Sequence, residues 1–297
     1  MALVVAEAFE GTVINADSMQ VYRDLSLLTA KPSATDMAQV PHRLYSIFDA
    51  TEKCSAARWL SLARTAVAEA HQAGRLPIVV GGTGLYLEVL QHGLAPVPEI
   101  PVAVQAETRA LMAAIGPAAF HTRLAMRDPA MAARLHPLDT QRLQRAWEVI
   151  AATGYSLSDW WQMKTGNLYA RFCSLLLMPA RPVLHASCDG RFWHMVAAGG
   201  VVTEVADLLA RNLPPGCPIL KAMGVAALAN YIRGRLTLEE AIVAGQTITR
   251  RYAKRQCTWF RHRLKDALTV PDRYFADHPS TIEILSFIHH FLLASKR

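Results

Sequence analysis

The stretch Pro77-Ile-Val-Val-Gly-Gly-Thr-Gly84 decides the fold of this chain, because a short apolar run ends there in a glycine-rich turn. A continuously apolar run of this length is typical of a buried strand in a parallel sheet. The segment after Gly84 has a helical pattern, and glycines let a backbone turn sharply and approach a ligand closely. The stretch therefore predicts a strand, a turn and a helix, with Thr83 offering a hydroxyl donor at a helix N-terminus that favours an anion.

Strands and helices also alternate upstream of this stretch. Residues 2–9 have a helical pattern without an N-cap, and Gly11 is expected to end that helix. Residues 12–16 are expected to form a strand, and Ser55 can cap a helix that runs to about residue 73. The expected core-facing side of that helix is formed by Trp59, Leu60, Ala63, Val67 and Ala70. This alternation predicts an α/β fold with a parallel sheet.

A central part of the chain is expected to leave the α/β core. Three prolines within residues 95–101 mark a boundary, and from there to about residue 161 the pattern is helical without a strand. Residues 175–178 and 183–184 are expected to return to the sheet, and the chain after Cys188 is expected to be helical to its end. The predicted organisation is an α/β core of residues 1–98 and 179–297, with a helical insertion domain of residues 99–178.

The composition favours a folded protein with an anionic partner. The chain has 297 residues, 52% of them hydrophobic, with a net charge of +7 and a pI of about 9.3. Such a charge suits a nucleic acid, although a basic enzyme without one is equally common. The five cysteines lack C-x-x-C spacing, so we expect no zinc or redox motif. Free thiols in a reducing cytoplasm are the simplest account of them. We also expect the protein to be a cytoplasmic monomer. The apolar residues 282–294 are too few to span a bilayer, so no membrane association is expected.

Asp17 is the first candidate for chemistry. It lies within Asn15-Ala-Asp-Ser-Met-Gln-Val-Tyr22, at the carboxyl end of the expected strand, where α/β folds place their ligands. Its carboxylate could act as a base or hold a metal ion. On this pattern alone, an Asp17-Ser18 helix N-cap is at least as common, so both interpretations stay open.

The stretch Gln141-Arg-Leu-Gln-Arg145 is a second candidate, for binding. Arg142 and Arg145 are three residues apart and therefore share a face of the predicted helix. A solvated helix face is the ordinary explanation of such a pair, and without further context it is the favoured one.

Residues 247–263 carry the strongest signal for nucleic acid. On a helix, six cations of this segment fall within about 140° of one another. They are Arg250, Arg251, Lys254, Arg255, Arg261 and His262. Like charges packed so closely are costly unless an anion neutralises them, and a phosphate backbone is the natural partner. The residues on the other side, which are expected to anchor the helix, are Tyr252, Trp259 and Phe260.

Together these motifs resemble the tRNA dimethylallyltransferase (isopentenyltransferase) family. The chain carries, in the family's order and spacing, Asn15-Ala-Asp-Ser-Met-Gln-Val-Tyr22, Thr29-Ala-Lys-Pro32, Val40-Pro-His-Arg43, Gly81-Gly-Thr-Gly-Leu-Tyr86, Gln141-Arg-Leu-Gln-Arg145 and Ala253-Lys-Arg-Gln-Cys-Thr-Trp-Phe-Arg261. The combination is highly specific. It implies a P-loop-type core of the kind that binds ATP and other nucleotides, a helical insertion domain and a positive channel for an anticodon stem–loop.

The resemblance implies transfer of a dimethylallyl group from dimethylallyl diphosphate to the exocyclic N6 of an adenine beside the anticodon, after that base is flipped from its stack. Diphosphate leaves with assistance from Mg²⁺, for which Asp17 is a candidate ligand. Asp17 also matches the family's proposed general base, and Thr83 matches the threonine thought to stabilise the leaving oxygen. The implied tRNA contacts are Asp17, Ser18, Met19, Gln20, Thr83, Gln105, Gln141, Arg142, Leu143, Gln144, Arg145, Arg250, Arg251, Lys254, Arg255 and Arg261.

Three features depart from the family's pattern. No G-x-x-x-x-G-K-[ST] stretch occurs in the chain, whereas relatives carry one after a first strand, where it binds diphosphate and Mg²⁺. Gly224-Val-Ala226 stands where many relatives have an arginine after a Gly-Tyr pair, and Gln105 stands where relatives often have a tRNA-facing arginine. The first departure predicts a core without its first strand and P-loop, and negligible transfer activity. The alternative is a non-catalytic tRNA-binding remnant; an enzyme that prenylates free adenine nucleotides ranks below both.

Overall fold

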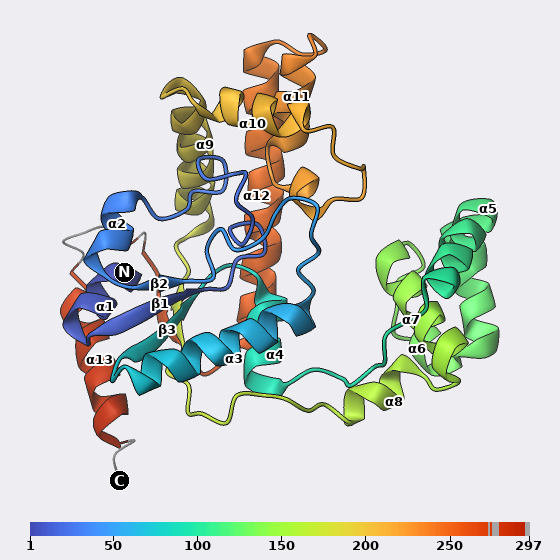
Figure 1. Ribbon diagram of the computed structural model, residues 1–297, viewed down its shortest axis with the longest axis horizontal. Coiled ribbons are helices and arrows are strands. Elements are labelled where there is room, and N and C mark those ends of the chain that lie inside the picture. The colour runs from blue at the N-terminus through green and yellow to red at the C-terminus, as the bar shows by residue number, and fades with distance from the viewer. Residues whose placement is uncertain (273, 275–278, 295–297) are drawn as a thin grey trace. The chain divides into compact units, whose positions relative to one another are not determined.

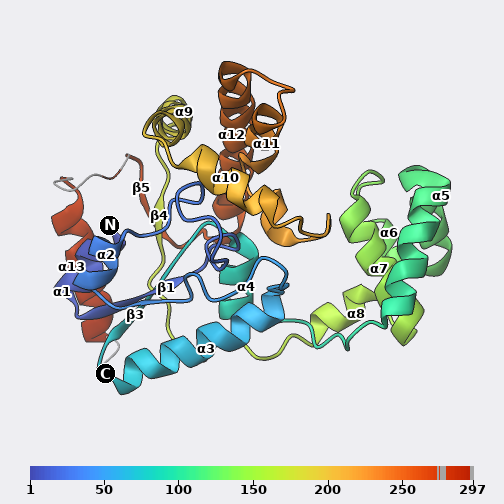
Figure 2. The same cartoon turned by 45° about the horizontal axis from the view of Figure 1, so that its top comes forward.

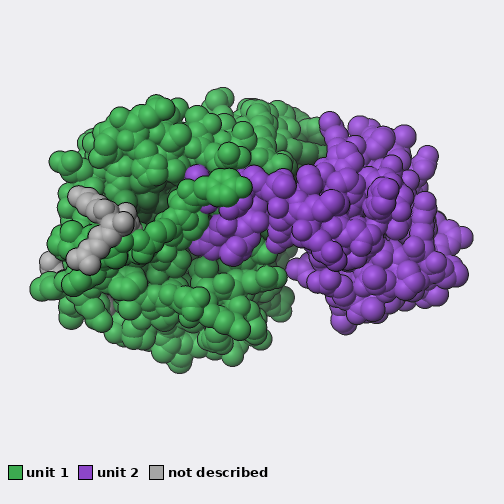
Figure 3. All heavy atoms as spheres, turned by 90° about the horizontal axis from the view of Figure 1, so that it is seen from below, with its two compact units in different colours: residues 1–90, 169–297 green, residues 91–168 purple. Residues whose placement is uncertain are grey.

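The computed structural model describes residues 1–272, 274 and 279–294. The chain forms two compact units (Figure 3), and unit 2 is inserted into the sequence of unit 1. Unit 1 comprises Met1–Leu90 and Tyr169–Arg297, and unit 2 comprises Gln91–Leu168.

A three-stranded parallel sheet lies in unit 1 (Figure 1). β1 (Gly11–Asn15) pairs with β2 (His42–Arg43) on one side and with β3 (Leu76–Val80) on the other. All residues of β1 are buried, as suits a strand with a neighbour on each side. The sequence predicts a buried β3 as well, but its residues are only half-buried, because β3 lies at one end of the described sheet. The sheet confirms the predicted α/β class.

The helices around this sheet begin close to where the sequence predicts them. The Ser55 side chain caps α3 (Ala56–Gln72) by accepting a hydrogen bond from the backbone N–H of Arg58. The indole N–H of Trp59 donates to the carbonyl of Asn15 at 2.9 Å, which fixes α3 on the end of β1. The uncapped α1 ends before Gly11, so this glycine opens β1 instead of ending the helix. The remaining bounds are Ala2–Ala8 for α1 and Ala34–Gln39 for α2.

A second, two-stranded sheet corrects the prediction for the C-terminal part of the chain. β4 (Leu175–Leu177) pairs in parallel with β5 (Leu268–Val270) and does not join the first sheet. β5 also contradicts the prediction that the chain is helical after Cys188. Residues 183–184, expected to be a strand, lie in α9 (Arg181–Ala197), because Pro182 at the first turn of α9 suits a helix start.

The long helix α12 (Leu238–Arg263) dominates this part of unit 1. Thr237 and Glu240 form a reciprocal capping box at its start. α9 and α11 pack along it, and Figures 1 and 2 both show them beside it. The predicted C-terminal helix is present as α13, which packs with α1 and β5 in one apolar cluster. The other bounds are Val201–Ala210 for α10, Pro218–Lys221 for the 3-10 helix η1, Val225–Ile232 for α11 and Thr281–Ala294 for α13.

No single helix in the described ranges is long and apolar enough to cross a membrane. The bent pair α9 and α10 reaches the required length and composition only together, with a 74° turn at its break. Both helices bury apolar side chains within the protein, including Phe192 and Val205, as the core helices of a folded domain do.

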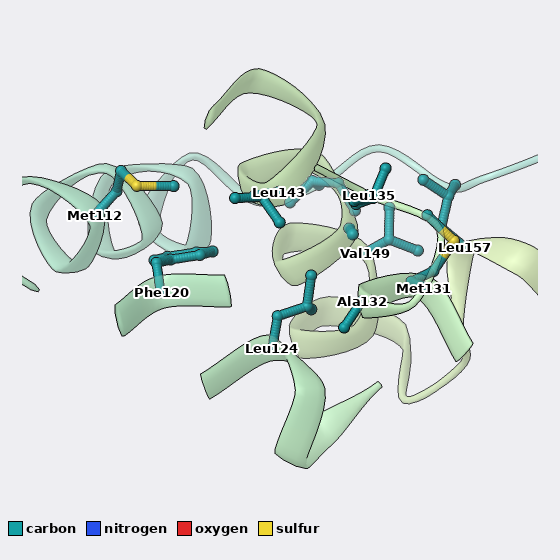
Figure 4. Close-up of a cluster of buried hydrophobic side chains, with 11 residues drawn as sticks. Met112, Phe120, Leu124, Met131, Ala132, Leu135, Leu143, Val149 and Leu157 are labelled. Atoms are coloured by element: carbon teal, nitrogen blue, oxygen red, sulfur yellow. The ribbon is translucent and has the colours of Figure 1, made fainter. Parts of the chain in front are cut away.

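Unit 2 is helical throughout its folded core, as the sequence predicts for this stretch. Its helices are α5 (Val102–Arg127), α6 (Pro129–Ala132), α7 (Thr140–Thr153) and α8 (Leu157–Gln162). Figure 4 shows the side chains that converge in its centre, including Phe120, Leu124, Met131, Leu143 and Val149.

The bounds of unit 2 differ from the predicted 99–178. The backbone N–H groups of Leu94 and Thr165 each donate to the other residue's carbonyl, at 2.9 and 3.0 Å. These bonds pair the two connecting segments with each other, so both ends of the compact unit lie earlier in the chain than predicted.

Candidate active site

The glycine-rich turn connects β3 directly to α4 (Gly84–His92), as the sequence predicts. The backbone N–H of Thr83 donates to the carbonyl of Ala16 at 3.2 Å, just beyond the end of β1. The turn therefore lies at the carboxyl ends of two neighbouring parallel strands, where α/β folds place their ligands.

Asp17 lies at the same edge and orders a second turn. Its Oδ1 accepts hydrogen bonds from the backbone N–H groups of Met19 at 2.7 Å and Gln20 at 3.3 Å. The buried side chain of Asn15 holds Asp17 in place, because its Oδ1 accepts from Asp17 N at 2.8 Å and its Nδ2 donates to Asp17 O at 3.0 Å. Asp17 thus caps a turn and not a helix, and within the described part of the chain its Oδ2 has no hydrogen-bond partner.

Ser18 joins the two turns. The backbone N–H of Ser18 donates to Oγ1 of Thr83 at 2.9 Å, and the Thr83 hydroxyl donates to Oγ of Ser18 at 3.2 Å. The structure therefore brings together Asp17 and Thr83, the two residues that the sequence singles out for chemistry, although they are far apart in the chain.

One face of α12 packs on the glycine-rich turn. The side-chain amide of Gln256 donates to the carbonyl of Gly82 at 2.8 Å. The indole of Trp259 lies against Gly84, where an added Cβ would come within 2.5 Å of it. The phenol of Tyr252 interacts with the side chains of Thr83 and Gln256. The sequence predicts that Tyr252 and Trp259 anchor the helix, but it gives no sign that they do so at the candidate site, and it does not single out Gln256.

Neutral phenols surround Asp17. Burial, followed by the charge of Asp17, raises the pKa of Tyr45 to about 12 and also raises the pKa of Tyr252. Burial is also the largest cause of the raised pKa of Tyr86, to which Cys54 and Asp17 add. These phenols stay protonated at neutral pH, and Asp17 forms no ion pair with any described residue. Its carboxylate is therefore free to accept a proton or a cation.

The exposed side of α12 carries the predicted basic stripe. Arg251, Lys254 and Arg255 are exposed, and the guanidinium of Arg255 lies 5.4 Å from the ring centre of Tyr252. Arg261 and His262 are exposed as well. Arg250 differs from the prediction: it is half-buried, and its Nη1 lies 2.5 Å from Oδ1 of Asp189. This ion pair engages the guanidinium that was expected to contact tRNA.

Comparison with known proteins settles the family. The profile of the IPP transferase family matches residues 20–263.

The chain belongs to the IPP transferase family.

Its relatives include a tRNA dimethylallyltransferase from Paramagnetospirillum magneticum, 50% identical over 295 residues that cover 99% of this chain and 93% of that protein. Another, from Rhodospirillum rubrum, is 50% identical over 99% of this chain and 91% of that protein. Both matches confirm the resemblance predicted from the motifs.

Solved structures agree with this assignment. A tRNA isopentenylpyrophosphate transferase from Bacillus halodurans has a TM-score of 0.71 and 34% identity, over 99% of this chain and 92% of that one. A eukaryotic dimethylallyltransferase acting on tRNA has a TM-score of 0.81 and 25% identity, over 99% of this chain and 76% of that one. These likenesses confirm the predicted P-loop-type α/β fold.

Gln20 and Lys31 bind backbone carbonyls close to the Asp17 turn. The side-chain amide of Gln20, predicted to contact tRNA, donates to the carbonyls of Thr29 and Ala30 at 2.9 and 3.0 Å. The Lys31 amine donates to the Tyr22 carbonyl and to the Ser46 hydroxyl. Burial lowers the pKa of Lys31 to about 8. These two side chains are therefore engaged within the protein.

In unit 2, some of the residues predicted to contact tRNA are buried and others are exposed. Leu143 is fully buried in the core of the unit, so its side chain cannot contact tRNA. The neighbouring Gln141, Arg142 and Arg145 are exposed, and Gln144 is half-buried. Helical periodicity explains the division, because a contiguous stretch on an amphipathic helix always includes core positions. The half-buried Gln105 donates to the carbonyl of Ile100 at 2.8 Å and so completes the start of α5.

The metal expectation rests on Asp17 alone. No group of three or more His, Cys, Asp or Glu side chains in the described ranges could hold a metal ion. Mg²⁺ usually keeps several waters and takes one or two carboxylates together with substrate phosphates. The free Oδ2 of Asp17 fits that kind of site, as a single protein ligand.

Proposed function

We propose that this protein transfers a dimethylallyl group from dimethylallyl diphosphate to the exocyclic N6 of an adenine next to the anticodon of tRNA. The observation that carries the proposal is the juxtaposition of Asp17, with one free carboxylate oxygen, and the Thr83 hydroxyl at the carboxyl ends of β1 and β3. The names of relatives at 50% identity support the same substrates.

The proposed step forms one bond and breaks another. N6 of the adenine attacks the first carbon of the dimethylallyl group, and the bond from that carbon to the bridging oxygen of the diphosphate breaks with both electrons going to oxygen. The proton of N6 goes to the free oxygen of Asp17, a positioned base. With substrate bound, the Thr83 hydroxyl turns its single proton from Oγ of Ser18 to the bridging oxygen, and this hydrogen bond strengthens as negative charge develops there in the transition state.

A Mg²⁺ ion, when bound, would neutralise charge on the departing diphosphate. Asp17 would be its protein ligand, with the remaining ligands coming from the diphosphate and water. The same oxygen of Asp17 cannot accept the N6 proton and bind the ion at once, so the two roles are alternatives that the Mg²⁺ dependence of an Asp17 variant separates.

The exposed cations of α12 would hold the tRNA. Arg251, Lys254 and Arg255 are exposed and can each meet a phosphate. Contacts of this kind give affinity and a steep salt dependence but little sequence information. Recognition of a particular adenine would therefore depend on groups that read bases.

The test is a transfer assay with tRNA, Mg²⁺ and labelled dimethylallyl diphosphate, followed by digestion to nucleosides. The chain is compared with a second preparation that carries a strand and a G-x-x-x-x-G-K-[ST] loop ahead of residue 1. We expect label on N6 of an adenine beside the anticodon from the preparation that carries the added strand and loop, and negligible label from the chain without them. Tight tRNA binding without label in either preparation would favour the non-catalytic binding protein, and label on free adenine nucleotides would favour a different substrate.

A further inference from the structure

Gln256 lies on a face of α12 that the proposed tRNA contacts do not use. Tyr252, Gln256 and Trp259 are spaced by four and three residues, so they line one side of the helix. Arg251 and Lys254 lie on the exposed side. Gln256 is half-buried, and its amide nitrogen reaches the Gly82 carbonyl at 2.8 Å.

This close approach depends on Gly82. A Cβ built on that residue would come within 2.1 Å of Nε2 of Gln256. Any other residue at position 82 would therefore push the amide away from the turn. The absence of a side chain at position 82 therefore leaves room for this hydrogen bond.

The Gly82 carbonyl and the Thr83 N–H belong to a single planar peptide group. Gln256 holds the carbonyl end, and the carbonyl of Ala16 accepts from the N–H end at 3.2 Å. A rigid plane held at both ends has a fixed orientation, and this orientation sets the direction in which the Thr83 side chain leaves the backbone. The hydroxyl then meets Ser18 N at 2.9 Å.

We propose that Gln256 is a positioning residue for the transfer step, which orients the Gly82–Thr83 peptide and thereby aims the Thr83 hydroxyl. The inference rests on the proposed function, in which that hydroxyl meets the leaving oxygen. Helix α12 would then have two roles: its exposed face presents cations to tRNA, and the face with Gln256 orients the glycine-rich turn.

The first test measures amide hydrogen exchange in the full chain. Gln256→Met keeps the length of the side chain but removes the donor, and we expect faster exchange in residues 81–84. Gln246→Met is the matched control: Gln246 is on the same helix and donates to the carbonyl of Asp189 at 3.1 Å. The control should leave exchange at residues 81–84 unchanged. Unchanged exchange there in Gln256→Met, or equal acceleration in both variants, would overturn the inference.

The second test uses single-turnover transfer with saturating tRNA, in the preparation that carries the added strand and loop. Misplacement of a reacting group by about 1 Å can cost about 10²-fold, so Gln256→Met should slow transfer roughly 10- to 100-fold while tRNA affinity stays the same. In a Thr83→Ala background, Gln256→Met should cause no further loss, since it acts through Thr83. Additive losses, or a loss of tRNA affinity that accounts for the slower transfer, would overturn the inference.

The two proposals fail in different ways. Absence of transfer by the preparation that carries the added strand and loop counts against the proposed function, whereas the exchange experiment still decides whether Gln256 holds the turn. Full transfer by Thr83→Ala would remove the role of the hydroxyl and, with it, the reason to position it.

Discussion

Helix α12 in unit 1 and helix α7 in unit 2 both expose arginines spaced three or four residues apart, but they bury different things on the opposite side. α12 places Gln256 and Trp259 on the glycine-rich turn at the candidate site. α7 buries Leu143, Ala146 and Val149 in a purely apolar core. The same sequence signal therefore belongs in one case to a helix that contacts the candidate site, and in the other to a helix that packs in the core of its own unit.

The cations on the two helices also differ in whether a carboxylate lies beside them. On α7, Arg142 lies 3.4 Å from Asp139 and Arg145 lies 3.7 Å from Glu148. On α12, Arg251 and Lys254 have no carboxylate partner in the described part of the chain. Exposed ion pairs contribute little stability, so α7 can exchange carboxylates for phosphates, but each exchange gives up an existing contact. We therefore expect α12 to contribute more affinity for tRNA.

The largest effect on turnover should come from a change of Asp17 at the candidate site. In Asp17→Asn, the remaining amide oxygen can still accept from Met19 N and Gln20 N, so the turn should persist. Loss of the base should reduce turnover roughly 10²- to 10⁴-fold while tRNA affinity changes little. Turnover is measured in the preparation that carries the added strand and loop, beside the exposed control Asp266→Asn.

Turnover close to normal in Asp17→Asn would leave Asp17 as a turn cap only. Recovery of turnover at high Mg²⁺ would instead identify the carboxylate as a metal ligand, because raising the ion concentration compensates for a weakened site but not for a missing base.

A glycine from each region sharpens the comparison. In Gly84→Ala, the new Cβ would lie 2.5 Å from the Trp259 ring, so α12 must shift at the candidate site. We expect a loss of about 1–3 kcal/mol in unfolding free energy, together with a clear loss of turnover. Gly154→Ala at the end of α7 has open space but a φ of +76°, so it should cost about 1 kcal/mol through backbone strain alone.

Urea unfolding and transfer are measured for both glycine variants. An equal loss of turnover in Gly154→Ala and Gly84→Ala would contradict the comparison, because of the two glycines only Gly84 contacts α12.

The sequence places Asp17 and the glycine-rich turn at one edge of the sheet, because local rules decide this part of the fold. The strand that ends at Val80, the glycine turn and Asp17 could all be placed, since parallel strands bring their carboxyl ends to one edge. Gln256 could not be found, because a neutral side chain in a basic helix gives no signal until its partner Gly82 is located in space. Leu143 was wrongly included, since a motif read as a contiguous stretch ignores which side chains a helix buries. The three-residue strand β5 was missed because so short an apolar run does not differ from a loop or a helix end.

Two adjacent arginines on α12 test the basic stripe. Arg251→Ala removes an exposed cation and should weaken tRNA binding several-fold, with a salt dependence flatter by roughly one unit of log–log slope per lost phosphate contact. Arg250→Ala breaks the pair with Asp189 and should lower stability by about 1 kcal/mol while leaving the salt slope unchanged. Titrations over a range of salt concentrations measure both, with the exposed Arg64→Ala as a control of equal charge. Equal salt slopes of tRNA binding for Arg251→Ala and Arg64→Ala would mean that the basic stripe is an ordinary solvated surface.

The smallest effect should come from Arg142 on α7. Its guanidinium lies beside Asp139, which also caps α7, and its side chain is 75% exposed. Removal of the cation in Arg142→Ala frees Asp139 while the cap bond to the backbone remains, so stability should change by less than about 0.5 kcal/mol. Affinity for tRNA should fall about two-fold, less than in Arg251→Ala, because the lost phosphate contact is offset by the ion pair already present in the free protein. Titrations at one low salt concentration compare the two variants directly. A larger loss in Arg142→Ala than in Arg251→Ala would reverse the ranking of the two helices and make unit 2 the principal tRNA-binding surface.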